Sequence, residues 1–98
     1  MELEIKGVHL DIRDETKDFI HEKLARVEFA SEYVISLDFT FTKDNAEYLA
    51  EAKLHFKWGA TPVIKTRAFD LHESINVLID KVDHKIKKER DKITDHKA

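Results

Sequence analysis

The chain has no cysteine, only two glycines and one proline, and no long apolar run. Without cysteine it has no disulfide, no thiolate metal ligand and no thiol nucleophile. Its apolar stretches fall far short of the ~18 residues that a membrane-spanning helix needs. Its first residues, Met1-Glu2-Leu3-Glu4, lack the basic and apolar segments of a secretory signal. We therefore expect a soluble protein of the cytoplasm, with regular elements joined by short loops.

Length and charge set the next limits. With 98 residues, 42% of them hydrophobic, the chain can build one core but hardly two, so we expect a single domain over residues 1–98. The formal net charge of −3 argues against a nucleic-acid partner. However, residues 81–98 contain seven Lys or Arg and four Asp or Glu, whereas residues 1–80 contain ten and sixteen. A basic C-terminal patch can bind phosphate despite the acidic total, because salt screens carboxylates beyond ~8 Å.

Four segments alternate between apolar and polar residues, which is the pattern of strands with one buried face. In chain order they are residues 2–6, 33–42, 48–58 and 63–68. The expected buried face of the second and third contains Tyr33, Ile35, Leu37, Phe39, Phe41, Tyr48, Ala50, Ala52, Leu54, Phe56 and Trp58. The short turn between these two segments predicts a long antiparallel hairpin.

Two segments carry apolar residues at helical spacing. The first helix is expected over residues 14–29, with Asp14 as its cap. The second is expected from residue 71 to about 93, and Asp70 followed by Glu73 gives it a start like a capping box. The order β-α-β-β-β-α predicts an α+β two-layer sandwich, in which two helices cover one face of a four-stranded sheet and the other face is open to water. Double-stranded RNA-binding domains have a similar arrangement.

Four lysines near the C-terminus, Lys81, Lys85, Lys88 and Lys92, recur at a spacing that places them in one stripe along a helix. The stripe lies roughly 110° around the axis from the apolar face of the same helix, so it borders the core and reaches solvent. Few acidic residues stand within one turn of it, which favours an anionic partner. An ordinary solvated helix face is an equally good interpretation of the spacing alone.

On the first helix, Lys17, Lys23 and Arg26 would join this stripe if the two helices packed side by side. A groove flanked by cations would suit folded RNA, recognised through phosphates and shape. The alternative is salt bridging within the first helix, where Asp14, Asp18 and Glu22 are in reach.

No pattern indicates catalysis. The six histidines show no metal-ligand spacing, the serines have no nucleophile context, and two glycines cannot form a phosphate loop. We therefore expect no enzyme activity, no metal and no cofactor. The strand aromatics fall on the expected core face, which disfavours base stacking on the sheet. A secondary basic patch on the open sheet face, balanced by acidic neighbours, contains Lys53, Lys57, Lys65 and Arg67.

Four segments carry a family resemblance. They are Gly7-Val8-His9-Leu10-Asp11-Ile12, Glu22-Lys23-Leu24-Ala25-Arg26-Val27, Ala50-Glu51-Ala52-Lys53-Leu54-His55 and Ile75-Asn76-Val77-Leu78-Ile79-Asp80-Lys81-Val82. In this order, and with the lysine-rich residues 85–92, the chain resembles the ribosome hibernation promoting factors, also called ribosome-associated inhibitor or sigma-54 modulation proteins. Because the chain ends six residues beyond Lys92, it resembles a short form.

The resemblance implies a factor that binds the small ribosomal subunit and its ribosomal RNA in the messenger and transfer RNA channel, and that inhibits translation under stress or in stationary phase. It implies no DNA or membrane partner and a monomer off the ribosome. Basic positions of the family are matched by Lys17, Lys23, Arg26, Lys81, Lys87, Lys88, Arg90 and Lys92, with Lys85 as an extra cation. A free-standing structured-RNA-binding module and a sigma-factor modulator are the alternatives.

Overall fold

The computed structural model describes residues 1–95, and the side chains of residues 1–93. Its elements are β1 (Glu2–Val8), α1 (Asp14–Leu24), the 3-10 segment η1 (Ala25–Glu32), β2 (Val34–Asp44), β3 (Glu47–Phe56), β4 (Val63–Ala68) and α2 (Leu71–Asp95). The predicted order β-α-β-β-β-α and the α+β class are confirmed.

The four strands form one sheet in the order β1-β2-β3-β4. β1 runs parallel to β2, which is possible because α1 and η1 carry the chain back between them. β2, β3 and β4 are antiparallel neighbours, and β2 and β3 form the predicted long hairpin. Asn45, with a φ of 56°, makes the tight turn of this hairpin.

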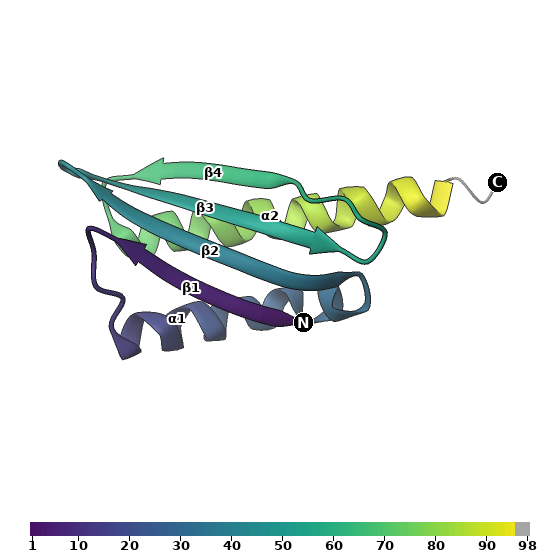
Figure 1. The fold of residues 1–98 in the computed structure, drawn as a ribbon, viewed down its shortest axis with the longest axis horizontal. Helices are drawn as coiled ribbons and strands as arrows, with labels where there is room; N and C mark the ends of the chain where they lie inside the picture. Colours follow the sequence, from purple (N-terminus) through teal and green to yellow (C-terminus); the bar gives the residue numbers. More distant parts are fainter. Residues whose placement is uncertain (96–98) are drawn as a thin grey trace.

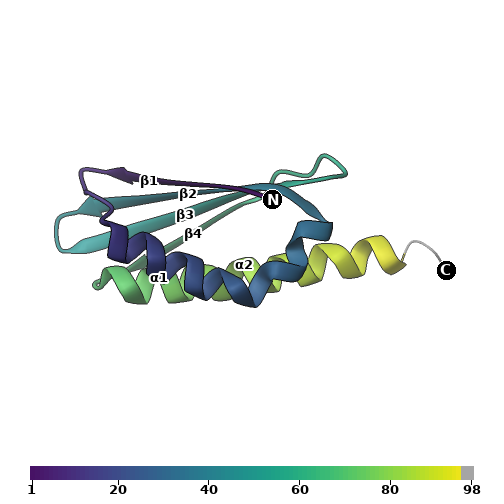
Figure 2. The same ribbon diagram turned by 90° about the horizontal axis from the view of Figure 1, so that it is seen from below.

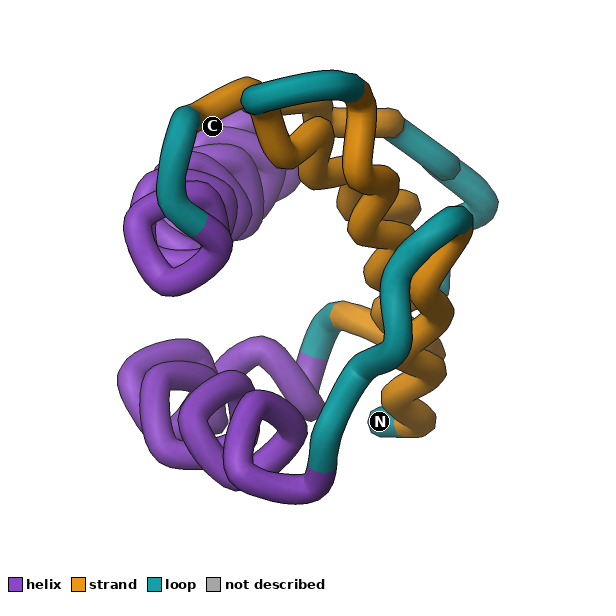
Figure 3. The backbone as a smooth tube through the Cα atoms, turned by 90° about the vertical axis from the view of Figure 1, so that its left-hand side faces the viewer, coloured by secondary structure: helices purple, strands orange, loops and turns teal. Residues whose placement is uncertain are grey.

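Both helices lie against the same face of the sheet (Figures 1 and 2). Seen along the strands, the sheet curves around them, with α2 toward its β4 end and α1 toward its β1 end (Figure 3). Between the layers lies a continuous apolar core, to which α2 contributes Ile75, Leu78, Ile79, Val82 and Ile86. No helix of residues 1–95 lies on the opposite face of the sheet.

The predicted alternation of β2 fails at its start. Val34 is buried at 1% exposure, whereas Ile35, expected on the core face, is 53% exposed. The register of β2 against β3 shifts between Val34 and Ser36, as in a β-bulge. A bulge adds one residue to the strand and so reverses the inside-outside alternation before it. From Leu37 onward the predicted face is buried.

Trp58 also departs from the expected core face. β3 ends at Phe56, and Trp58 lies in the following turn with 37% of its surface exposed. Its ring stacks on Phe56 at 4.8 Å and meets Tyr33 edge-on at 6.4 Å. Gly59, with a φ of 96°, allows the chain to reverse direction there. The alternation therefore ends two residues before Trp58.

The first helix is shorter than predicted. The α-helix ends at Leu24 and the chain continues as a 3-10 segment, in which Val27 has non-helical backbone angles. Asp14 is the first helical residue and not the cap. The cap position belongs to Arg13, whose carbonyl accepts hydrogen bonds from the backbone nitrogens of Thr16 and Lys17.

The second helix begins as predicted and extends past the sheet. The backbone nitrogen of Glu73 donates to Asp70 Oδ2 at 3.0 Å, which confirms the cap. Ile86 is fully buried, whereas Ile93 is 39% exposed. The C-terminal end of α2 extends past the sheet (Figure 1). No helix in the described part of the chain is both long enough and apolar enough to cross a membrane.

The bulge predicts different costs for one polar substitution at adjacent positions. Val34→Thr places an unpartnered hydroxyl in the core and should lower the free energy of unfolding by ~1–3 kcal/mol. Ile35→Thr keeps a β-branched side chain at an exposed site and should change it by less than ~0.5 kcal/mol. Urea unfolding of both variants measures this. A larger loss for Ile35→Thr would show that the alternation is regular and that the bulge is absent.

Candidate nucleic-acid interface

The lysine stripe lies on the flank of α2 that faces away from α1. The opposite flank faces α1 and η1, as two contacts show. The ring of His72 stacks on Phe19 of α1 at 4.4 Å, and Asp83 approaches Arg26 of η1. Lys85 is two residues from Asp83 and therefore ~160° from it around the axis. On the stripe side, a groove of about 350 Å³ runs between α2 and β4. Its lining is Ile64, Asp80, Lys81, His84, Lys85 and Lys88.

Acidic residues of the helix neutralise only part of this stripe. Glu89 lies 3.2 Å from the amine of Lys85 and 3.7 Å from that of Lys92, so one carboxylate serves two cations. Among the described side chains, Lys81 and Lys88 have no ion-pair partner, and both are exposed. The stripe therefore presents two uncompensated amines to solvent.

The inner flank of α2 has a different character. Arg26 Nη1 donates to Asp80 Oδ1 at 2.6 Å, and Arg26 Nη2 lies 3.9 Å from Asp83 Oδ2. Lys87 Nζ also reaches Asp83 Oδ2, at 3.1 Å. The Lys87 amine and the Arg90 guanidinium each lie 6.0 Å from the Phe29 ring centroid. These side chains join α2 to η1, so we call this cluster the helix seam.

The cations of the first helix do not join the stripe. The two helices do pack side by side, but Arg26 is in the helix seam, and the Lys23 amine lies 5.3 Å from the centroid of Phe19, on the side toward α2. Lys17 is two residues from Phe19 and therefore ~160° around the helix, pointing away from α2. The nine predicted RNA-binding residues thus do not share one surface: four are in the stripe, Arg26, Lys87 and Arg90 are in the helix seam, and Lys17 and Lys23 lie on two different sides of α1.

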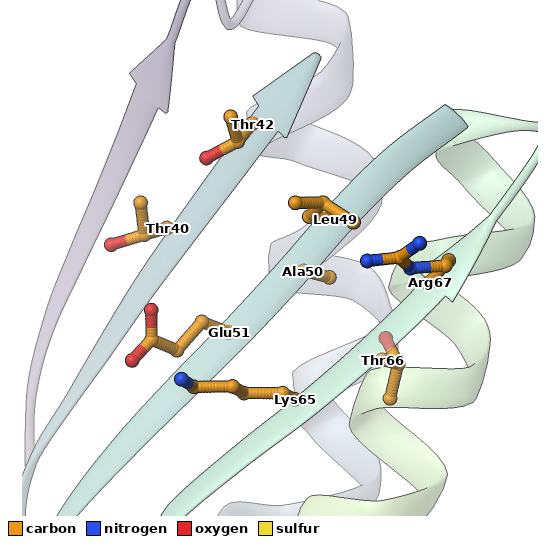
Figure 4. Close-up of a pocket in the computed structure, with 8 residues that line it drawn as sticks. All are labelled: Thr40, Thr42, Leu49, Ala50, Glu51, Lys65, Thr66 and Arg67. Carbon is orange, nitrogen blue, oxygen red and sulfur yellow. The ribbon is translucent and has the colours of Figure 1, made fainter. Parts of the chain in front are cut away.

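The open sheet face carries the secondary basic patch in a diluted form. Arg67 is 3.6 Å from Glu47, and His55 is 3.3 Å from Asp38. A hollow of about 460 Å³ on this face is lined by Thr40, Thr42, Leu49, Ala50, Glu51, Lys65, Thr66 and Arg67. Figure 4 shows Lys65 pointing toward Glu51, its cross-strand partner. Among the described side chains, Arg67 of this patch has an ion-pair partner, whereas Lys53, Lys57 and Lys65 have none. Acidic residues lie between these cations on the same face, so the patch does not form a continuous basic row like the stripe.

Sequence reasoning missed the helix seam and the groove beside β4. The pair Arg26 and Asp80 is 54 positions apart, and Ile64 meets α2 only because β4 is the last strand of the sheet. No local pattern signals either contact. In the described part of the chain, no cluster of three or more His, Asp or Glu side chains could hold a metal ion.

Comparison with known proteins identifies one family and several relatives. The model of the family described as Sigma 54 modulation protein / S30EA ribosomal protein matches residues 3–94. A ribosome hibernation promoting factor of Azotobacter vinelandii is 30% identical over 92 residues, which are 94% of this chain and 85% of that protein. The protein of that name from Escherichia coli K12 is 24% identical over 96 residues, covering 98% of this chain and all of the relative.

Solved structures show the same fold. A ribosomal subunit interface protein from Coxiella burnetii matches with a TM-score of 0.83 at 17% identity, over 92% of this chain and 98% of that one. The N-terminal domain of Thermus thermophilus Protein Y matches with a TM-score of 0.78 at 20% identity, over 90% and 98%. Because the family model spans nearly all of the chain, this protein belongs to the Sigma 54 modulation protein / S30EA ribosomal protein family.

Proposed function

We propose that this protein is a ribosome hibernation factor of the cytoplasm. It binds the small ribosomal subunit in the channel for messenger and transfer RNA and inhibits translation under stress or in stationary phase. Its family and the names of its curated relatives support this role. The role requires no catalytic step, because a protein that occupies the channel excludes the RNAs that translation needs.

The observation that carries this proposal is the pair of uncompensated amines on the stripe. Lys81 and Lys88 are exposed and have no ion-pair partner among the described side chains. A phosphate group can therefore approach them without displacing a carboxylate of the same protein. Such contacts release the counterions condensed on RNA, and this release provides much of the affinity.

The remaining predicted contacts differ in how accessible they are. Lys85 and Lys92 share Glu89, so a phosphate would compete with one carboxylate for two amines. Lys17 is exposed on the outer side of α1. In the helix seam, Arg26, Lys87 and Arg90 already contact side chains of this protein, and Lys23 of α1 lies over the ring of Phe19. We propose that the stripe makes the main RNA contacts and that the seam residues mainly hold α2 against the rest of the fold.

Charge removal at the stripe should change the salt dependence of ribosome binding. Lys81→Ala and Lys88→Ala should each lower the slope of log affinity against log salt by about one, because each removes one phosphate contact. Equilibrium binding to vacant small subunits at several salt concentrations measures the slope. Lys6→Ala, which removes an exposed lysine from β1, is the matched control and should leave the slope unchanged.

Equal slopes for all three variants would contradict the role of the stripe. Sedimentation with ribosomes separates the proposed hibernation role from the two alternative functions. Co-migration with small subunits supports hibernation. Binding to other structured RNA without co-migration would support the free-standing RNA module, and ribonuclease-resistant capture of a sigma factor would support a modulator.

The helix seam should behave differently from the stripe. Arg26 and Asp80 are about half exposed, so a double-mutant cycle with Arg26→Gln and Asp80→Asn should give a coupling of only ~0.2–1 kcal/mol in the free energy of unfolding. Arg26→Gln should also leave the salt slope of ribosome binding nearly unchanged. A loss of a full unit in that slope would show that Arg26 leaves Asp80 and contacts phosphate.

A further inference from the structure

The outer edge of β4 is an unpaired strand edge. β4 is the last strand of the sheet, and β3 is its only neighbour in the described part of the chain. The backbone nitrogen of Leu54 donates to Pro62 O at 3.1 Å, which sets the alternation of hydrogen-bonded pairs along the two strands. Val63, Lys65 and Arg67 therefore direct their backbone N–H and C=O groups outward. These groups can pair with another extended chain.

A groove runs directly beside this edge. It lies between Ile64 of β4 and the stripe side of α2, and its surface is mostly apolar because the aliphatic stems of the lysines line it. A strand paired with β4 would place every second side chain toward the helices, over Ile64 and into this groove. The free edge and the groove thus form one continuous surface.

The charge on the rim of the groove favours an acidic occupant. The amines of Lys81 and Lys88 have no ion-pair partner among the described side chains. Asp80 also borders the groove, but Arg26 binds its carboxylate at 2.6 Å. Carboxylates on either side of an apolar residue would therefore meet two available amines.

We propose that the β4 edge binds an extended acidic segment of a partner protein as a fifth strand. The side chains of the segment that face the helices are an apolar residue over Ile64, with an acidic residue two positions before it and another two positions after it. Backbone pairing provides affinity, and the alternate side chains provide specificity. The site goes beyond ribosome binding and does not require it. A segment bound there would compete with RNA, because both need Lys81 and Lys88.

A second copy of the chain fits this edge less well. Antiparallel pairing of two β4 strands about a two-fold axis would place like cations, such as Lys65 and its equivalent, against each other. Lysine on an exposed edge strand disfavours pairing between copies. The same cations attract a segment of opposite charge.

The test titrates the 98-residue protein with a capped peptide, Thr-Glu-Thr-Val-Thr-Glu-Thr. NMR and amide hydrogen exchange monitor binding at each backbone N–H group. We expect protection of the backbone N–H groups of Val63, Lys65 and Arg67 on titration. Lys81→Ala and Lys88→Ala should each weaken binding about two- to fivefold, as expected for one exposed ion pair.

Two peptide controls separate strand pairing from charge attraction. Thr-Thr-Glu-Val-Glu-Thr-Thr has the same composition but places its glutamates on the face opposite to valine, and it should bind more weakly. Two further peptides carry N-methyl groups on either the odd-numbered or the even-numbered backbone nitrogens. One of the two should lose binding and the other should keep it, because only one set of nitrogens faces β4.

Three results would overturn the proposal. The first is equal binding of the two peptides, and the second is equal binding of the two N-methylated sets. The third is protection of the same amides by rising protein concentration without peptide, which would identify a second copy as the occupant. Ribosome binding does not enter these measurements, so their failure would leave the proposed function intact.

Discussion

The burial of the apolar line of α2 fixes the direction of every cation on that helix. Ile75, Leu78, Ile79, Val82 and Ile86 are almost completely buried against the sheet and α1. Full burial of each such side chain contributes roughly 1.5–3 kcal/mol, whereas an exposed ion pair contributes about 1 kcal/mol or less. The core therefore sets the rotation of the helix, and the charges take the positions that remain. A rotation of α2 that gave each lysine an acidic partner would expose these apolar side chains. The free energy lost in this way would exceed the free energy that the new ion pairs contribute.

This hierarchy explains why the two flanks of α2 differ. The inner flank meets α1 and η1, so its cations are within reach of acidic and aromatic side chains of the same protein, as Lys87 is of Asp83 and Phe29. The outer flank meets only β4, an edge strand with no acidic side chain directed toward the helix. Lys81 and Lys88 remain uncompensated because of where the sheet ends. The net charge of −3 therefore says little about this surface.

The features that were predicted from the sequence are those encoded locally. The order of the elements, the long hairpin and the Asp70 cap follow from alternation, helical spacing and a side-chain oxygen near backbone donors. The errors lie where tertiary contacts override a local pattern. At Ile35 a bulge reverses the alternation, and near Val27 the helix tightens into a 3-10 segment before β2. Neither break has a signal such as proline or glycine in the sequence.

The candidate site shows the same division between local and long-range information. Helical periodicity predicted the stripe, because the spacing of four residues within one helix places them on the same flank independently of the rest of the fold. It could not predict which residues of other elements contact α2. Ile64 lies beside α2 because of the order of the strands, and Arg26 because of the path of η1. Lys17, Lys23 and Arg26 looked equivalent in the sequence, but they lie in different surroundings once α1 contacts α2 along Phe19. Which cations are free to meet a polyanion is therefore a property of the assembled fold, and a spacing rule alone cannot determine it.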